Sequence, residues 1–183
     1  MPGMMDSILN IGLNDSNVFQ LAEAFNDERF ALDSYRRLIQ MYSNVVLGVE
    51  HERFEAVLAN KKRMDNVVSD ADFNVDQLNW IINAYKNTVE RFTDSLFPQD
   101  PYEQLTGAIE AVFNSWQNKR AVIYRKINNI PDSWGTGATI QSMVFGNLND
   151  KSGTGVAFTR NPSNGDKELY GEYLINAQGE DVV

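Results

Sequence analysis

Apolar residues recur at helical spacing through the first two thirds of the chain. Five such segments follow one another: a short one ending near Phe25, residues 27–46, 50–64 and 75–92, and one beginning at Asp100. In the second segment the apolar positions are Ala31, Tyr35, Leu38, Ile39, Tyr42, Val45 and Val46. These positions share one face of an α-helix. Asp100 is a suitable N-cap and Pro101 suits the first helical position, so we predict a helical bundle of roughly 90 residues.

The pattern changes sharply in the last third of the chain. Apolar residues come there in short runs rich in β-branched and aromatic side chains, separated by Gly, Asn, Asp and Pro. The four runs are residues 121–125, 138–145, 155–159 and 169–175. They predict a small, mainly antiparallel sheet, whose glycine-rich loops suit a backbone that approaches phosphate groups. The predicted fold class is therefore α+β, with a helical bundle followed by a small sheet.

Composition limits the cellular location and the kinds of chemistry that the protein can have, and it leaves the predicted fold unchanged. The chain is 43% hydrophobic and 22% charged, as in an ordinary globular protein. No apolar run approaches the ~20 residues of a membrane span, and residues 1–6 do not resemble a signal peptide. The sequence has no cysteine, which excludes disulfides, thiolate metal sites and cysteine nucleophiles. We expect a cytoplasmic protein with no membrane partner.

Charge is distributed unevenly along the chain. The net charge is −9, with 18 acidic and 9 basic side chains in residues 1–115 and 7 of each in residues 116–183. A nucleic-acid-binding protein would present a basic face, so a nucleic-acid partner is disfavoured. We interpret the acid-rich helices as solvated faces.

Single residues give little indication of chemistry by themselves. His51 is the only histidine, it lies just inside a predicted helix start, and a surface or capping role is the commoner one. The short glycine loops at residues 135–137 and 152–155 equally suit hairpin turns, and no Walker-type motif is present. Glu172, Glu180 and Asp181 have no role that spacing alone assigns.

Longer strings of the sequence are more specific. In order along the chain they are residues 1–6 (MPGMMD), 97–101 (FPQDP), 124–131 (YRKINNIP), 153–162 (GTGVAFTRNP) and 171–183 (GEYLINAQGEDVV). Together they resemble the nucleotide-binding domain of the pyruvate, phosphate dikinase family, and the resemblance covers essentially the whole chain. The related phosphoenolpyruvate synthases share only looser versions of these strings.

The resemblance implies both a fold and an activity. Family enzymes convert ATP, phosphate and pyruvate to AMP, pyrophosphate and phosphoenolpyruvate with Mg²⁺. The resemblance implies an ATP-grasp domain, in which residues 1–14 carry a phosphate loop, residues 15–118 form a helical insertion, and residues 119–183 form part of the β-rich subdomain. It also implies a homodimeric parent enzyme with a swivelling phosphohistidine domain and a pyruvate-binding barrel.

The resemblance also implies site residues. Gly3, Met4, Met5, Asp6 and Ser7 match the loop that approaches the ATP phosphates. A second group matches the adenine and ribose side of the cleft: Gln141, Met143, Val144 and Glu180. Arg160 and Glu172 lie on matching stretches without a definite role.

Other functional groups of the family have no match in these residues. The phosphate-contacting lysine and arginine, the Mg²⁺ ligands and the phosphohistidine belong to other parts of the family sequence, so we expect no catalytic residue and no metal ligand here. Phosphoryl transfer depends on such charges, so we expect the chain to be a piece of a larger enzyme with no turnover alone. Two alternatives stay open: a non-catalytic helical interaction module, and a piece of a phosphoenolpyruvate synthase-type enzyme.

Overall fold

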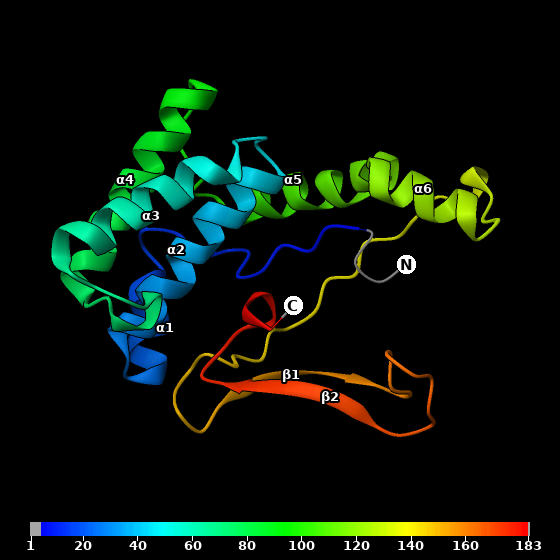
Figure 1. The fold of residues 1–183 in the computed structure, drawn as a ribbon. Helices are drawn as coiled ribbons and strands as arrows, with labels where there is room; N and C mark the ends of the chain where they lie inside the picture. Colours follow the sequence, from blue (N-terminus) through cyan, green and yellow to red (C-terminus); the bar gives the residue numbers. More distant parts are fainter. Residues whose placement is uncertain (1–4, 183) are drawn as a thin grey trace. The chain divides into compact units, whose positions relative to one another are not determined.

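A computed structural model describes residues 5–182, except for the side chain of Glu180. The chain divides into two compact units, residues 1–140 and residues 141–183, and each is described by itself. The first unit is helical, and the second is built on a two-stranded hairpin (Figure 1).

Six α-helices occur within the described part of the first unit. They are α1 (Val18–Phe25), α2 (Glu28–Val45), α3 (His51–Asp65), α4 (Val75–Thr93), α5 (Pro101–Asn114) and α6 (Lys119–Ile127). Short 3₁₀ turns lie between them: η1 (Asp70–Asp72), η2 (Ser115–Gln117) and η3 (Asp132–Trp134). The five predicted helices are confirmed. The first begins at Val18, with Asn17 as its N-cap.

The helix starts follow from local capping chemistry. Asp27 accepts a hydrogen bond from the backbone N–H of Phe30 at the start of α2, at 2.9 Å. Asp100 accepts one from Tyr102 N–H at 2.8 Å and is followed by Pro101 at the first helical position. Both caps satisfy backbone donors that a helix start leaves without an intrahelical partner.

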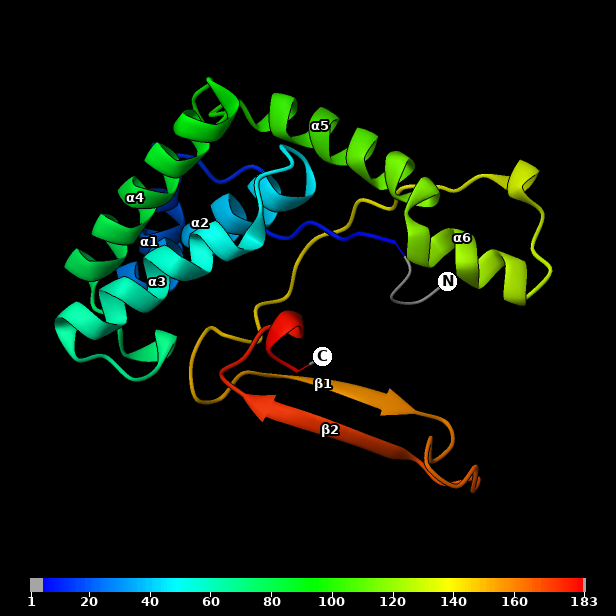
Figure 2. The same ribbon diagram turned by 45° about the horizontal axis from the view of Figure 1, so that its top comes forward.

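The core of the first unit lies mainly between α2, α3 and α4. Its fully buried side chains come from the predicted apolar stripes and include Ala31, Tyr35, Leu38, Ile39, Phe54, Leu78, Ile81, Tyr85 and Val89. Phe54 and Tyr85 meet edge to face, with ring centroids 5.0 Å apart. Burial of each large apolar side chain contributes about 1.5–3 kcal/mol to the free energy of folding, so this core stabilises the folded helical unit. Figure 2 shows α5 and α6 following one another away from these helices.

The strand predicted at residues 121–125 is wrong, because this run forms α6. Ala121 and Arg125 are four residues apart and both are buried, so they share one helical face. Arg125 donates from Nε to Asp132 at 2.7 Å and from Nη1 to the carbonyl of Trp116 at 2.5 Å. These contacts favour a helix over the weak β-propensity of the run.

The second unit contains an antiparallel pair, β1 (Gly153–Phe158) and β2 (Tyr170–Ile175), followed by η4 (Gly179–Asp181). Gly153 faces Ile175 and Phe158 faces Tyr170. Two predicted strands are thus confirmed. The strand predicted at residues 138–145 is wrong, because this segment pairs with no described strand and stays irregular. The small antiparallel sheet of the predicted α+β fold is confirmed in its two-stranded form.

Candidate nucleotide site

The predicted phosphate loop begins the first unit. Gly3 and Met4 lie outside the described residues, while Met5, Asp6 and Ser7 lie within them and only Ser7 is exposed. From Met5 the chain runs beside α5 in both views (Figures 1 and 2). The loop therefore leads into a segment that is packed on the helical unit.

Asp6 is the anchor of the described part of the loop. Its backbone N–H donates to Ser115 Oγ at 3.4 Å, and its carboxylate accepts from Asn118 Nδ2 at 3.1 Å and pairs with Arg120. These three partners lie at the junction of α5, η2 and α6. The carboxylate of Asp6 is therefore committed to protein partners, and its contribution is to fix the loop.

A hollow of about 190 Å³ adjoins Asp6. It is lined by Asp6, Val45, Val46, Gly107, Glu110, Ala111, Asn114, Ser115 and Asn118. Sites for drug-sized ligands commonly measure about 300–1,000 Å³. This hollow by itself is thus too small to enclose a whole nucleotide.

The predicted adenine residues lie in the second unit. Gln141 and Val144 are exposed, Val144 to 91%, and Met143 is half-buried. They belong to the irregular segment before β1, not to a strand. Glu180 lies in η4, and its side chain lies outside the described part of the structure.

Hydrogen bonds bring these two segments to the same end of the hairpin. Ala177 N–H donates to the carbonyl of Gly146 at 3.0 Å, and Thr154 Oγ1 donates to the carbonyl of Ala177 at 2.6 Å. A Cβ at Gly146 would lie 2.3 Å from that same Ala177 carbonyl, so only glycine allows this approach. Val144 is two residues before Gly146 and Glu180 is three after Ala177, so these contacts bring together the segments that carry the two residues.

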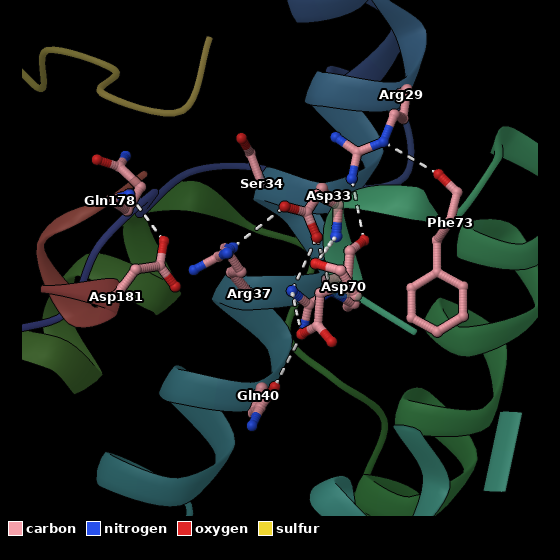
Figure 3. Close-up of polar contacts among 12 residues, drawn as sticks. Arg29, Asp33, Ser34, Arg37, Gln40, Asp70, Phe73, Gln178 and Asp181 are labelled. Atoms are coloured by element: carbon pink, nitrogen blue, oxygen red, sulfur yellow. Dashed lines mark hydrogen bonds and ion pairs between the residues drawn. The ribbon is translucent and has the colours of Figure 1, made fainter. Parts of the chain in front are cut away.

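The turn that carries Glu180 is itself held in place. Gln178 N–H donates to Asp181 Oδ2 at 2.8 Å across η4 (Figure 3). Such reciprocal capping fixes a short turn that has few hydrogen bonds of its own. The backbone position of Glu180 is thus set by its neighbours on both sides.

Sequence reasoning did not find the buried charge network of α2. Asp33 is 5% exposed and Arg36 is 2% exposed, which corrects the interpretation of the acidic side chains as solvated at Asp33, whereas Glu28 on the same helix is exposed. Arg37 pairs with Asp33 at 3.1 Å (Figure 3). Arg36 pairs with Asp33 at 2.8 Å and lies 3.8 Å from Asp70. Spacings of three and four residues between opposite charges are the signal that could have indicated it.

The network changes the ionisation of its members. Burial alone would raise the pKa of the Asp33 carboxyl, but the charges of Arg36 and Arg37 outweigh burial and hold that pKa below its usual range. Burial would lower the pKa of Arg36, and the charge of Asp33 raises it instead. Asp33 is therefore ionised at neutral pH and pairs within α2, while Arg36 and Arg29 connect this helix to the turn at Asp70.

His51 lies at the surface at the start of α3, with its Nε2 atom 3.4 Å from Glu55. Among the side chains that the structure describes, no group of three or more His, Cys, Asp or Glu is arranged to hold a metal ion. The same described residues contain no helix long and apolar enough to cross a membrane.

Comparison with known proteins identifies the class to which this arrangement belongs. The family model described as "Pyruvate phosphate dikinase, AMP/ATP-binding domain" matches residues 1–183. Similar proteins named pyruvate, phosphate dikinase occur in Rhizobium meliloti (strain 1021), at 56% identity, and Clostridium symbiosum, at 54%. The chloroplastic protein of Mesembryanthemum crystallinum is 53% identical. Each alignment covers 100% of this chain and 20%, 21% and 19% of the respective relative.

The chain is thus an α+β domain of the AMP/ATP-binding class. It belongs to the pyruvate phosphate dikinase family, as the match over all its residues shows. It spans about a fifth of the length of the curated relatives that it matches. These matches do not favour a helical interaction module or a phosphoenolpyruvate synthase-type enzyme.

Proposed function

We propose that this chain is the ATP-binding part of a dikinase that converts ATP, phosphate and pyruvate to AMP, pyrophosphate and phosphoenolpyruvate. The observation that carries the proposal is identity of 56% and 54% to dikinases over every residue of the chain. Identity at this level, without a gap in coverage, supports a shared nucleotide chemistry.

In this proposal the two groups of site residues face different parts of ATP. The loop at Gly3, Met4, Met5, Asp6 and Ser7 approaches the phosphates through backbone N–H groups other than that of Asp6, because amides beside glycine suit anions. Gln141, Met143, Val144 and Glu180 contact adenine and ribose. The anchoring of Asp6 to Ser115 and Asn118 supports the first assignment, since a phosphate loop must be held in place.

The proposal extends to domain organisation and partners. Residues 1–14 carry the phosphate loop, residues 15–118 the helical insertion, and residues 119–183 the β-rich part of an ATP-grasp domain. The partners are ATP and the remaining domains of a homodimeric cytoplasmic enzyme, without nucleic acid or membrane. Mg²⁺ would neutralise the transferred phosphoryl group when bound, and its ligands belong to other parts of the family sequence.

Steady-state turnover of the full-length enzyme tests this function. AMP and phosphoenolpyruvate should form only when ATP, phosphate, pyruvate and Mg²⁺ are all present. Turnover that does not need phosphate would contradict the proposed reaction.

The 183-residue chain provides a second test. It should form no AMP or phosphoenolpyruvate alone, because the phosphohistidine and the metal ligands are supplied by other parts of the family sequence. Dikinase turnover by this chain alone would show that the catalytic groups have been assigned to the wrong parts of the enzyme.

A further inference from the structure

The amide of Gln104 is buried and fully hydrogen-bonded at the N-terminal end of α5. Its side chain is 0% exposed. Oε1 accepts from Gly12 N–H at 2.8 Å, and Nε2 donates to the carbonyls of Leu13 at 3.0 Å and Pro98 at 2.8 Å. Both amide hydrogens and the oxygen are used, which leaves only one orientation of the amide consistent with its partners.

The segment that Gln104 holds is the continuation of the predicted phosphate loop. Gly12 has a φ of +102°, a conformation that side-chain-bearing residues rarely adopt, and this turn directs its N–H toward Gln104. Leu9 and Asn10 are held between the two ends, through contacts with Met41 and with the carbonyl of Ser34. The loop therefore enters the bundle along a path with hydrogen bonds at several points.

The two ends of this path are fixed to the two ends of α5. Gln104 holds Gly12, and Ser115 accepts from the N–H of Asp6. Eleven helical residues from Gln104 to Ser115 rise about 17 Å. Six residues from Asp6 to Gly12 reach about 20 Å when extended. The turn at residues 10–12 shortens this reach, and Leu9 and Asn10 are held between the two ends. The contacts at Gly12 and Asp6 therefore set the path of residues 6–12 along α5 together.

We infer that Gln104 is a positioning residue for the nucleotide phosphates, acting through the register of residues 6–12 along α5. The inference rests on the proposed function. In this proposal Gln104 does not contact the nucleotide itself. Its effect reaches the phosphates through Asp6 and the neighbouring loop. A side chain of similar length without the amide leaves Gly12 N–H and two carbonyls without these partners.

The test compares Gln104→Met with Leu58→Ala in the full-length enzyme. Methionine keeps the unbranched shape and the helix preference of glutamine but none of these hydrogen bonds. Leu58 is buried in α3, so its truncation destabilises the bundle, and it leaves every hydrogen bond of the N-terminal segment intact because its side chain has no polar atom. Both variants are measured below their thermal transitions, by hydrogen exchange of residues 5–9 and by kcat/KM for ATP.

Gln104→Met should speed exchange at residues 5–9 and lower kcat/KM for ATP on the order of tenfold, because it frees the loop. Its half-reaction between phosphoenolpyruvate and the phosphohistidine should be unchanged, and Leu58→Ala should change neither measurement. Faster exchange confined to Gly12 and Leu13, or an unchanged kcat/KM for ATP, would overturn the role of Gln104 alone. Absence of ATP turnover in the unmodified enzyme would overturn the phosphate role together with the proposed function, while the exchange data would still decide whether Gln104 sets the register.

Discussion

The core of the helical unit encloses aromatic side chains, whereas the strands of the hairpin unit leave theirs exposed. Phe54 and Tyr85 are fully buried between helices α2, α3 and α4. Tyr173 on β2 is 76% exposed, and its neighbours Leu174 and Ile175 are exposed as well. The first unit therefore contains its own core, whereas the strands of the second present apolar side chains to their surroundings.

This difference indicates where the stability of the chain arises. A two-stranded hairpin is at best marginally stable in water without further packing. The hairpin is held by its ladder and by turn contacts such as Thr154 to Ala177, each worth about 0.5–1.5 kcal/mol. We expect a cooperative unfolding transition of the chain to report mainly on the helical unit.

Matched aromatic truncations test this comparison most directly. Phe54→Ala should lower the free energy of unfolding by about 3–5 kcal/mol, because it leaves a cavity beside Tyr85. Tyr173→Ala removes an exposed ring and should change it by less than about 0.5 kcal/mol. Urea titration followed by helical circular dichroism measures both. Equal losses would show that the two units unfold as one cooperative body.

The buried charge network gives the next largest effect. Asp33→Asn keeps the side-chain size but removes the charge that compensates Arg36, and should destabilise the helical unit by about 3 kcal/mol at pH 7. The pKa of Asp33 is lowered on folding, so its contribution is present above the unfolded pKa of about 4 and is lost as pH falls through the folded value. The difference between the two proteins should therefore shrink when urea titrations are repeated at pH 3.

An exposed ion pair provides the control for that experiment. Glu50 pairs with Arg53 at 2.7 Å on the surface of α3. Glu50→Gln should change stability by less than about 1 kcal/mol at pH 7. A difference between the unmodified protein and Asp33→Asn that stays constant from pH 3 to pH 7 would contradict a role for the Asp33 charge.

The same contrast explains which parts of the fold could be predicted. The stripes of α2 and α4 predicted their helices because the core that they bury lies inside the same unit. Periodicity failed at α6, where Ala121 and Arg125 are buried but the run between them is rich in β-branched residues and partly exposed. The prediction also failed at residues 138–145, because no described strand pairs with this segment despite its β-propensity. Propensity alone does not supply the pairing that a strand needs.

The candidate site was predicted through its strings of residues, not through its geometry. No local pattern indicated that Gly146 and Ala177 would meet, because that contact joins positions 31 residues apart. Gln104 was equally hidden: it is a polar residue on a helix, and only its partners Gly12, Leu13 and Pro98 indicate a role. Long-range polar contacts of this kind depend on the assembled fold and leave no periodic signal.

A functional variant extends the comparison to the hairpin unit. In the full-length enzyme Glu180→Ala should lower kcat/KM for ATP tenfold to a hundredfold, since a charge-assisted hydrogen bond is worth about 1.5–3 kcal/mol. The half-reaction between phosphoenolpyruvate and the phosphohistidine should survive. Stability of the helical unit should not change. Equal damage to both half-reactions would show that Glu180 acts through folding.

The smallest expected effect concerns a single hydroxyl in the helical core. Tyr85 donates from its hydroxyl to Gln40 Oε1 at 3.2 Å, so Tyr85→Phe should cost about 0.5–1.5 kcal/mol at pH 7 while its ring stays against Phe54. Burial raises the pKa of Tyr85 to about 12, against the opposing charge of Arg36. An unfolded tyrosine ionises near pH 10, so the contribution of Tyr85 is present below about pH 10 and is lost as pH rises toward its folded value. The phenylalanine variant has no such proton to lose, so the difference in stability between the two proteins should narrow between pH 10 and pH 12.

Tyr102→Phe, at an exposed position on α5, is the control and should match the unmodified protein in urea titrations at pH 7. A difference that stays constant to pH 12 would show that the Tyr85 hydroxyl is not held neutral by the core.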